Sequence, residues 1–108
     1  MSRRLRLAAV SFLNARPITY GIERGLVGAD RFDLQFAEPS RCAAAVAAGE
    51  ADLGLIPIAG YAASAEDLRA VPGIAIASHG SVRTVLLVGH VPWEGMASIA
   101  LDGASRTS

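Results

Sequence analysis

Leu5-Arg-Leu-Ala-Ala-Val10, with Ser11-Phe-Leu-Asn14 and Pro17 after it, decides the fold. The first six residues are typical of a short apolar strand, and the next four form a loop that leaves it. Pro17 suits the first turn of a helix, because its missing N–H would have no helical partner there. Ile18, Ile22 and Leu26 then recur at helical spacing. The helix is expected to end at Gly25 or Gly28.

The same alternation of strand and helix continues along the chain. Strands are predicted at 32–36 and 52–56, and helices at 41–48 and 60–70. Ser40 is the expected N-cap of the second helix and Gly49 its end. Further strands are predicted at 74–77, 82–88 and 98–101, with a turn or one helical turn at 90–96. The order β-α-β-α-β-α-β-β-β indicates an α/β fold with a mostly parallel sheet.

Length and charge limit the function classes. The 108 residues allow one small domain, or a piece of a larger one. Ten basic and ten acidic residues give a net charge of zero, which argues against sequence-independent binding to nucleic acid. No apolar run approaches the ~20 residues of a membrane span, and no signal-peptide cleavage site follows the N-terminal residues. We therefore expect a cytoplasmic protein that binds neither nucleic acid nor membrane.

Cysteine and histidine give little sign of chemistry. Cys42 is the single cysteine and lies in an Ala-rich stretch, so a buried packing role is favoured over a nucleophile. His79 and His90 stand apart from any Cys or acid at ligand spacing, which makes a metal site improbable. His79 could act as a general base, but a solvated loop side chain is the favoured interpretation.

Polar residues follow the predicted strands, and ligands of open α/β sheets bind at the carboxyl ends of the strands. The Asn14 amide offers two donors and two acceptor lone pairs, which suits holding a hydroxyl or a carboxylate. The alternative is that Asn14 caps the following helix. Ser40 and the helix N-terminus beside it could hold an anion, although an ordinary N-cap explains Ser40 equally. Asp52 is assigned a structural role in the turn after Gly49.

Two later segments add candidate ligand-binding groups. Thr84 lies two residues into a predicted strand and could direct its hydroxyl to a cleft. Ser105-Arg106-Thr107-Ser108 supplies three hydroxyls and a guanidinium, a good carboxylate cradle at a helix N-terminus or a plain capping segment. The sequence has no Gly-rich phosphate loop and no nucleophile elbow. These features alone indicate an α/β domain with a polar, anion-friendly rim.

The motifs in their order resemble the MqnA family, the chorismate dehydratases of the futalosine route to menaquinone. Six motifs carry the resemblance, which spans about Arg6 to Ser108: Ser11-Phe-Leu-Asn-Ala-Arg-Pro17, Pro39-Ser-Arg-Cys42, Asp52-Leu-Gly-Leu-Ile-Pro57, Pro72-Gly-Ile-Ala-Ile-Ala-Ser78, Gly80-Ser-Val-Arg-Thr-Val-Leu-Leu87 and Leu101-Asp-Gly-Ala-Ser-Arg-Thr-Ser108. The resemblance implies the two-lobed fold of periplasmic-binding-protein type II. Residues 1–89 would form part of the first lobe, and residues 90–108 the crossover and the start of the second. The chain would then be truncated, and its partner would be the missing C-terminal segment of its own parent chain.

The resemblance also implies a reaction. The family removes water from chorismate and yields 3-(1-carboxyvinyloxy)benzoate, without a cofactor or metal. Asn14 matches the asparagine tied to catalysis, and Thr84 matches a position where family members often carry Ser. The substrate-binding residues expected on this basis are Ser11, Arg16, Ser40, Thr84, Ser105, Arg106 and Thr107.

A second hypothesis comes from a different class. A domain of this fold could capture a small carboxylate without chemistry, in transport or sensing. Asn14 with Arg16-Pro17 favours the enzyme. In either case we expect no turnover from these 108 residues alone, because a lobe without its returning segment leaves apolar sheet surface uncovered.

Overall fold

Three parallel strands form the sheet of this protein. The computed structural model describes residues 3–64, 67–83 and 85–104. Strand β1 (Leu5–Ala9) lies in the centre, between β2 (Phe32–Phe36) and β3 (Leu53–Gly54). Leu5 pairs with Phe32 and Leu7 pairs with Leu53. The predicted α/β class and the parallel pairing are confirmed.

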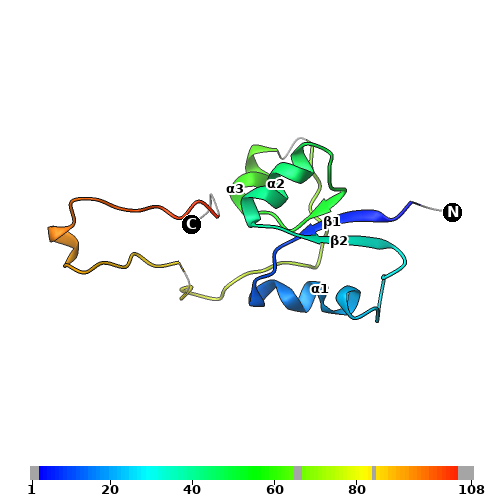
Figure 1. The fold of residues 1–108 in the computed structure, drawn as a ribbon, viewed down its shortest axis with the longest axis horizontal. Helices are drawn as coiled ribbons and strands as arrows, with labels where there is room; N and C mark the ends of the chain where they lie inside the picture. Colours follow the sequence, from blue (N-terminus) through cyan, green and yellow to red (C-terminus); the bar gives the residue numbers. More distant parts are fainter. Residues whose placement is uncertain (1–2, 65–66, 84, 105–108) are drawn as a thin grey trace.

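Helices cover both faces of the sheet. Helix α1 (Arg16–Glu23) lies on one side, while α2 (Pro39–Ala47) and α3 (Ile58–Ala63) lie together on the other (Figure 1). This arrangement follows from the strand order, because the β1-to-β2 and β2-to-β3 connections run in opposite directions across the sheet and right-handed crossovers then place their helices on opposite faces. Two short 3₁₀ helices, η1 (Leu13–Ala15) and η2 (Trp93–Gly95), complete the regular structure of the described residues.

The ends of the first two long helices follow the sequence signals closely. Pro17 lies in the first turn of α1, and Gly25 follows that helix with φ +67°. Gly49 follows α2 with φ +73°, a left-handed conformation that favours glycine. The predicted start of α2 is wrong by two residues, because Pro39 is itself the first helical residue.

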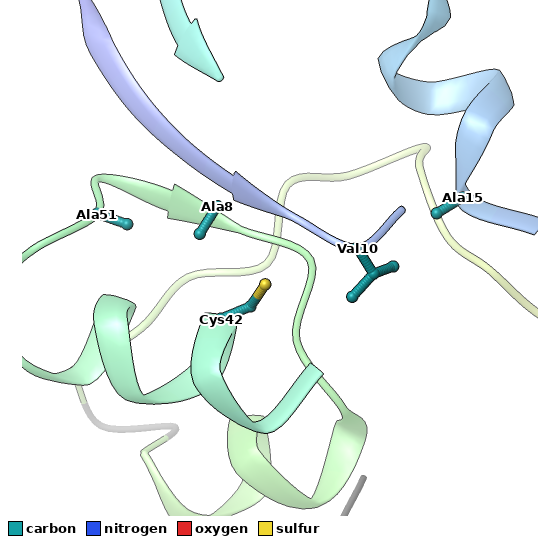
Figure 2. Packing of buried hydrophobic residues seen from close by; sticks show 5 residues of the cluster. All are labelled: Ala8, Val10, Ala15, Cys42 and Ala51. Atoms are coloured by element: carbon teal, nitrogen blue, oxygen red, sulfur yellow. The ribbon is translucent and has the colours of Figure 1, made fainter. Parts of the chain in front are cut away.

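The core between β1 and α2 is built from small side chains. Figure 2 shows Ala8, Val10, Ala15, Cys42 and Ala51, which make up its buried cluster. Cys42 is fully buried, and its thiol donates to the Ala37 carbonyl at 3.6 Å. Burial raises the pKa of this thiol. The packing role predicted for Cys42 is confirmed.

Two predicted elements are shorter than expected. The strand predicted at 52–56 is assigned only at Leu53–Gly54, although Asp52 N–H donates to the Arg6 carbonyl and Leu55 N–H to the Ala8 carbonyl, both at 2.9 Å. The helix predicted at 60–70 is α3, which begins directly after Pro57 and ends at Ala63.

The strands predicted beyond α3 are wrong in the described part of that region. We call residues 67–83 and 85–104 the arm. Within these described residues, 74–77, 82–83, 85–88 and 98–101 belong to no strand. The apolar pattern is present, but a strand is stable only with a hydrogen-bonded neighbour. The arm passes beside the sheet, loops out to one side of it and returns toward α2, without adding a strand to the sheet over its described residues (Figure 1). The radius of gyration, 16.6 Å, accordingly exceeds the ~13 Å of a compact chain of this length. The turn predicted at 90–96 is confirmed as η2.

Candidate functional site

The carboxyl ends of the three strands meet at one edge of the sheet. Beyond β2, the Ala37 N–H donates to the Ala9 carbonyl at 2.9 Å, and beyond β3, the Leu55 N–H donates to the Ala8 carbonyl at 2.9 Å. Segments that follow the strands therefore start side by side. Ser11 and Asn14 follow β1 at this edge, and both are exposed.

Asn14 lies in η1, the turn between β1 and α1. Ala15 anchors this turn, because its side chain is fully buried and its N–H donates to the Phe12 carbonyl at 3.0 Å. Ala15 is the N-cap of α1, and no side chain caps that helix. The alternative that Asn14 caps α1 is therefore wrong. Among the described residues, the Asn14 amide has no hydrogen-bond partner, so both its donors and its acceptors are available to a ligand.

Arg16 is the first residue of α1, and its guanidinium is held from two sides. Its Nη1 forms an ion pair with the Glu23 carboxylate, two helical turns further on. Its guanidinium carbon also lies 5.3 Å from the centre of the Phe36 ring, at the carboxyl end of β2. These contacts place a substrate-binding candidate beside the edge that carries Ser11 and Asn14.

Glu23 is fixed in turn by Thr19. The Thr19 hydroxyl donates to Glu23 Oε2 at 2.8 Å, and Thr19 is fully buried. This hydrogen bond, together with Arg16, holds the pKa of Glu23 below its usual range. Neither Thr19 nor Glu23 is predicted as a site residue from the sequence. Their signal is the spacing, since Thr19 and Glu23 are four apart and face each other on a helix.

A groove runs beside this group on the surface of α1. It has a volume of about 330 Å³ and is lined by Arg16, Tyr20, Glu23 and Arg24. The Arg24 guanidinium lies over the Tyr20 ring, 5.6 Å from its centre. Two guanidinium groups against one carboxylate leave the groove with a net positive charge, which suits an anionic ligand.

Ser40 is not the N-cap of α2, so the N-cap predicted from the sequence is wrong. Glu38 is the N-cap, and no side chain caps the helix. The Ser40 N–H donates to the Ala104 carbonyl at 3.1 Å, so that donor is already used by the chain. The Ser40 hydroxyl stays a candidate ligand group.

The contact between Ser40 and Ala104 brings the end of the arm back to this edge. Ala104 N–H also donates to Asp102 Oδ1 at 3.0 Å, in a local turn. Thr84, Ser105, Arg106 and Thr107 lie outside the described residues.

Asp52 lies away from this edge, before β3, and has the structural role predicted for it. Its carboxylate accepts hydrogen bonds from the Arg6 backbone N–H at 2.8 Å and from the Arg3 guanidinium at 2.9 Å. The Arg6 guanidinium adds bonds at 3.1 Å. Hydrogen bonds from Arg3 and then Arg6 hold the pKa of Asp52 well below its usual range. This cluster ties the N-terminus to the turn before β3.

Comparison with known families gives one result that spans the chain. The family model described as menaquinone biosynthesis matches residues 5–108. No solved structure matches the chain. Among the described residues, no helix is both long enough and apolar enough to span a bilayer.

Proposed function

The chain belongs to the menaquinone-biosynthesis family, and we propose that it is the N-terminal portion of a chorismate dehydratase. The substrate would be chorismate and the product 3-(1-carboxyvinyloxy)benzoate. Residues 1–89 would belong to the first lobe of a two-lobed enzyme, and residues 90–108 to the crossover and the start of the second lobe. The chain would work in the cytoplasm and would need the rest of its parent enzyme for turnover.

The observation that carries this proposal is the state of Asn14. The Asn14 amide lies at the carboxyl edge of the sheet, is exposed, and makes no structural hydrogen bond among the described residues. An asparagine in a turn usually serves a cap or an Asx turn. In the part of the chain that the structure describes, Asn14 serves neither use, while the buried Ala15 fixes the turn that presents it.

The chemistry needs positioning more than a strong base. A ring C–H next to the hydroxyl-bearing carbon loses its proton, and the electron pair forms the ring double bond. The C–O bond to the hydroxyl breaks, and the hydroxyl leaves as water with the proton that the ring has lost, which the carboxylate that takes it would pass on. All electrons come from the substrate, and the aromatic product makes the reaction downhill. The substrate's own enolpyruvyl carboxylate would take the proton, so the protein would mainly fix geometry.

In this scheme the side-chain chemistry of each residue determines its role. The Asn14 NH₂ group would donate to the departing hydroxyl and favour its loss. Arg16, Ser11 and the Ser40 hydroxyl would bind carboxylate oxygens from the first lobe. Thr84, Ser105, Arg106 and Thr107 would supply further hydroxyl and guanidinium groups.

Incubation of the purified protein with chorismate tests the proposal. The protein should be the product of the complete reading frame that contains residues 1–108, with the 108-residue chain as a second sample. The ultraviolet spectrum and the mass of the product should show the loss of one water in the first sample. A protein that binds chorismate, measured as a rise in melting temperature, without loss of water would instead be the non-catalytic carboxylate-binding module.

A further inference from the structure

Arg16, Glu23 and Thr19 form a connected group whose spacing is unusual for a surface helix. Ordinary stabilising pairs on a helix are three or four residues apart. Arg16 and Glu23 are seven apart, so the two long side chains reach along the helix to meet. Thr19, one turn before Glu23, places a buried hydroxyl against the second carboxylate oxygen.

We propose that Thr19 and Glu23 are positioning residues that hold the Arg16 guanidinium ready to bind the carboxylate of a small organic acid. This inference rests on the proposed function only for the identity of that acid. The Arg16–Glu23 contact uses one guanidinium nitrogen, and a guanidinium has five N–H donors. The remaining donors can form the two parallel hydrogen bonds that a carboxylate accepts.

The burial of Thr19 supports a positioning role. Thr19 is fully buried on the inner face of α1, where an apolar side chain of the same size would also fill the space. Its hydroxyl donates a hydrogen bond to Glu23 Oε2 at 2.8 Å and lies 3.5 Å from the Arg16 carbonyl oxygen. A buried hydroxyl that binds a carboxylate restricts the rotamers of that carboxylate and, through it, those of Arg16.

The surroundings of Arg16 provide room for the ligand. The guanidinium is less than half exposed, lies against the Phe36 ring, and borders the groove of about 330 Å³ on α1. That volume is at the lower end of the range for small-molecule sites. A ring-bearing carboxylate could therefore bind Arg16 and contact Phe36, which is partly exposed at the end of β2.

Calorimetric titration of the 108-residue chain with chorismate and, separately, with benzoate tests this inference, because binding needs no turnover. The variants are Glu23→Gln, Thr19→Val and Thr19→Ser, with Glu94→Gln, at an exposed carboxylate of η2, as the control for the loss of one negative charge. We expect Glu23→Gln to weaken binding about tenfold, because it removes the ion pair that holds Arg16, and Thr19→Val about fivefold, because it removes only the hydroxyl that supports Glu23. Thr19→Ser keeps the hydroxyl and should restore binding to within about twofold of the unmodified chain.

A second readout separates positioning from folding. The Nε–H signal of Arg16 in NMR relaxation should report a rigid side chain in the unmodified chain and in Thr19→Ser, and a mobile one in Thr19→Val. Circular dichroism shows which variants keep their helices. If Glu23→Gln fails to fold, the Thr19→Val and Thr19→Ser pair decides the matter alone.

The outcomes distinguish this inference from the proposed function. Benzoate binding that responds to the variants, without chorismate binding, would support the role of Arg16 and count against chorismate as the substrate. Equal or tighter binding by Glu23→Gln would overturn the inference, because Glu23 would then compete with the ligand for Arg16. It would also be overturned if Thr19→Ser behaved like Thr19→Val, or if neither acid bound to the unmodified chain.

Discussion

Residues 3–64 and the arm are similarly apolar, yet only the first region builds a sheet. In β1, Ala9 is fully buried and each residue pairs with β2. In the arm, Leu86 and Val88 are 69% and 82% exposed, although Val85-Leu-Leu-Val88 is the more hydrophobic sequence. An apolar pattern is therefore compatible with a strand, but the strand forms only where a neighbouring strand pairs with it and a helix covers it.

Amide hydrogen exchange should show the largest contrast between the two regions. Amides of β1, such as Leu7 and Ala8, are protected by pairing on both sides. Amides at 85–88 lie in no strand and in exposed residues. We expect the arm to exchange about a hundredfold faster or more, since its opening requires almost no free energy. Similar protection in both regions would show that the arm is paired in solution.

Alanine substitution at one glycine in each region should show how closely that region is packed, through its effect on the free energy of unfolding. A Cβ at Gly54 would lie 2.5 Å from Cγ2 of Val46 and 3.2 Å from Cγ2 of Ile56, whereas a Cβ at Gly103 would meet nothing within 4 Å. Gly54→Ala should lower the free energy of unfolding by about 1–3 kcal/mol through overpacking. Gly103→Ala should change it by less than about 0.5 kcal/mol.

Urea denaturation followed by circular dichroism measures both variants. Equal midpoints for Gly54→Ala and Gly103→Ala would mean that α2 does not pack on β3 as closely as described.

The pH dependence of unfolding should give the smallest effect, at Asp52. Its pKa in the folded protein lies below the unfolded value of about 4. The Asp52 hydrogen bonds therefore stabilise the fold above about pH 4, and this stabilisation is lost as the pH falls toward the folded pKa. Asp52→Asn should lower the melting temperature at neutral pH, and its melting curve should converge with that of the unmodified chain in acid.

Asp102→Asn in the arm is the matched control for Asp52→Asn. Among the described residues, the Asp102 carboxylate accepts a local hydrogen bond from Ala104 and no other, so this variant should leave the melting temperature unchanged across the same pH range. Parallel curves for Asp52→Asn and the unmodified chain would argue against the described cluster with Arg3 and Arg6.

The sequence predicted those features of the fold that depend on local patterns. Phe32-Asp-Leu-Gln-Phe36 alternates apolar and polar residues, and β2 covers that range. Gly25 and Gly49 mark the ends of their helices because both adopt positive φ. Pro39 was harder to interpret, since proline breaks a strand and also begins a helix, and only the second use fixes the start of α2.

The remaining failures concern contacts between distant residues. Nothing in the local pattern of Val82 to Val88 shows whether a strand lies beside it. Serine is a favoured N-cap residue, but the N-cap of α2 is Glu38. The Ser40 N–H instead donates to the carbonyl of Ala104, which lies far along the chain. In the candidate site, Asn14 and Arg16 were predicted as ligand groups, whereas the support of Arg16 by Phe36 required knowing that α1 packs beside β2.

The most direct test of the account is the effect of Asn14→Ala on chorismate dehydration by the product of the complete reading frame. Gln35→Ala is the matched control, because it removes an exposed amide from the interior of β2 rather than from the carboxyl edge. The account predicts that Asn14→Ala lowers the rate about a hundredfold or more, with unchanged circular dichroism, while Gln35→Ala keeps the rate. Dehydration at the unmodified rate in Asn14→Ala would contradict the role of Asn14, and no dehydration by the unmodified enzyme would contradict the proposed reaction.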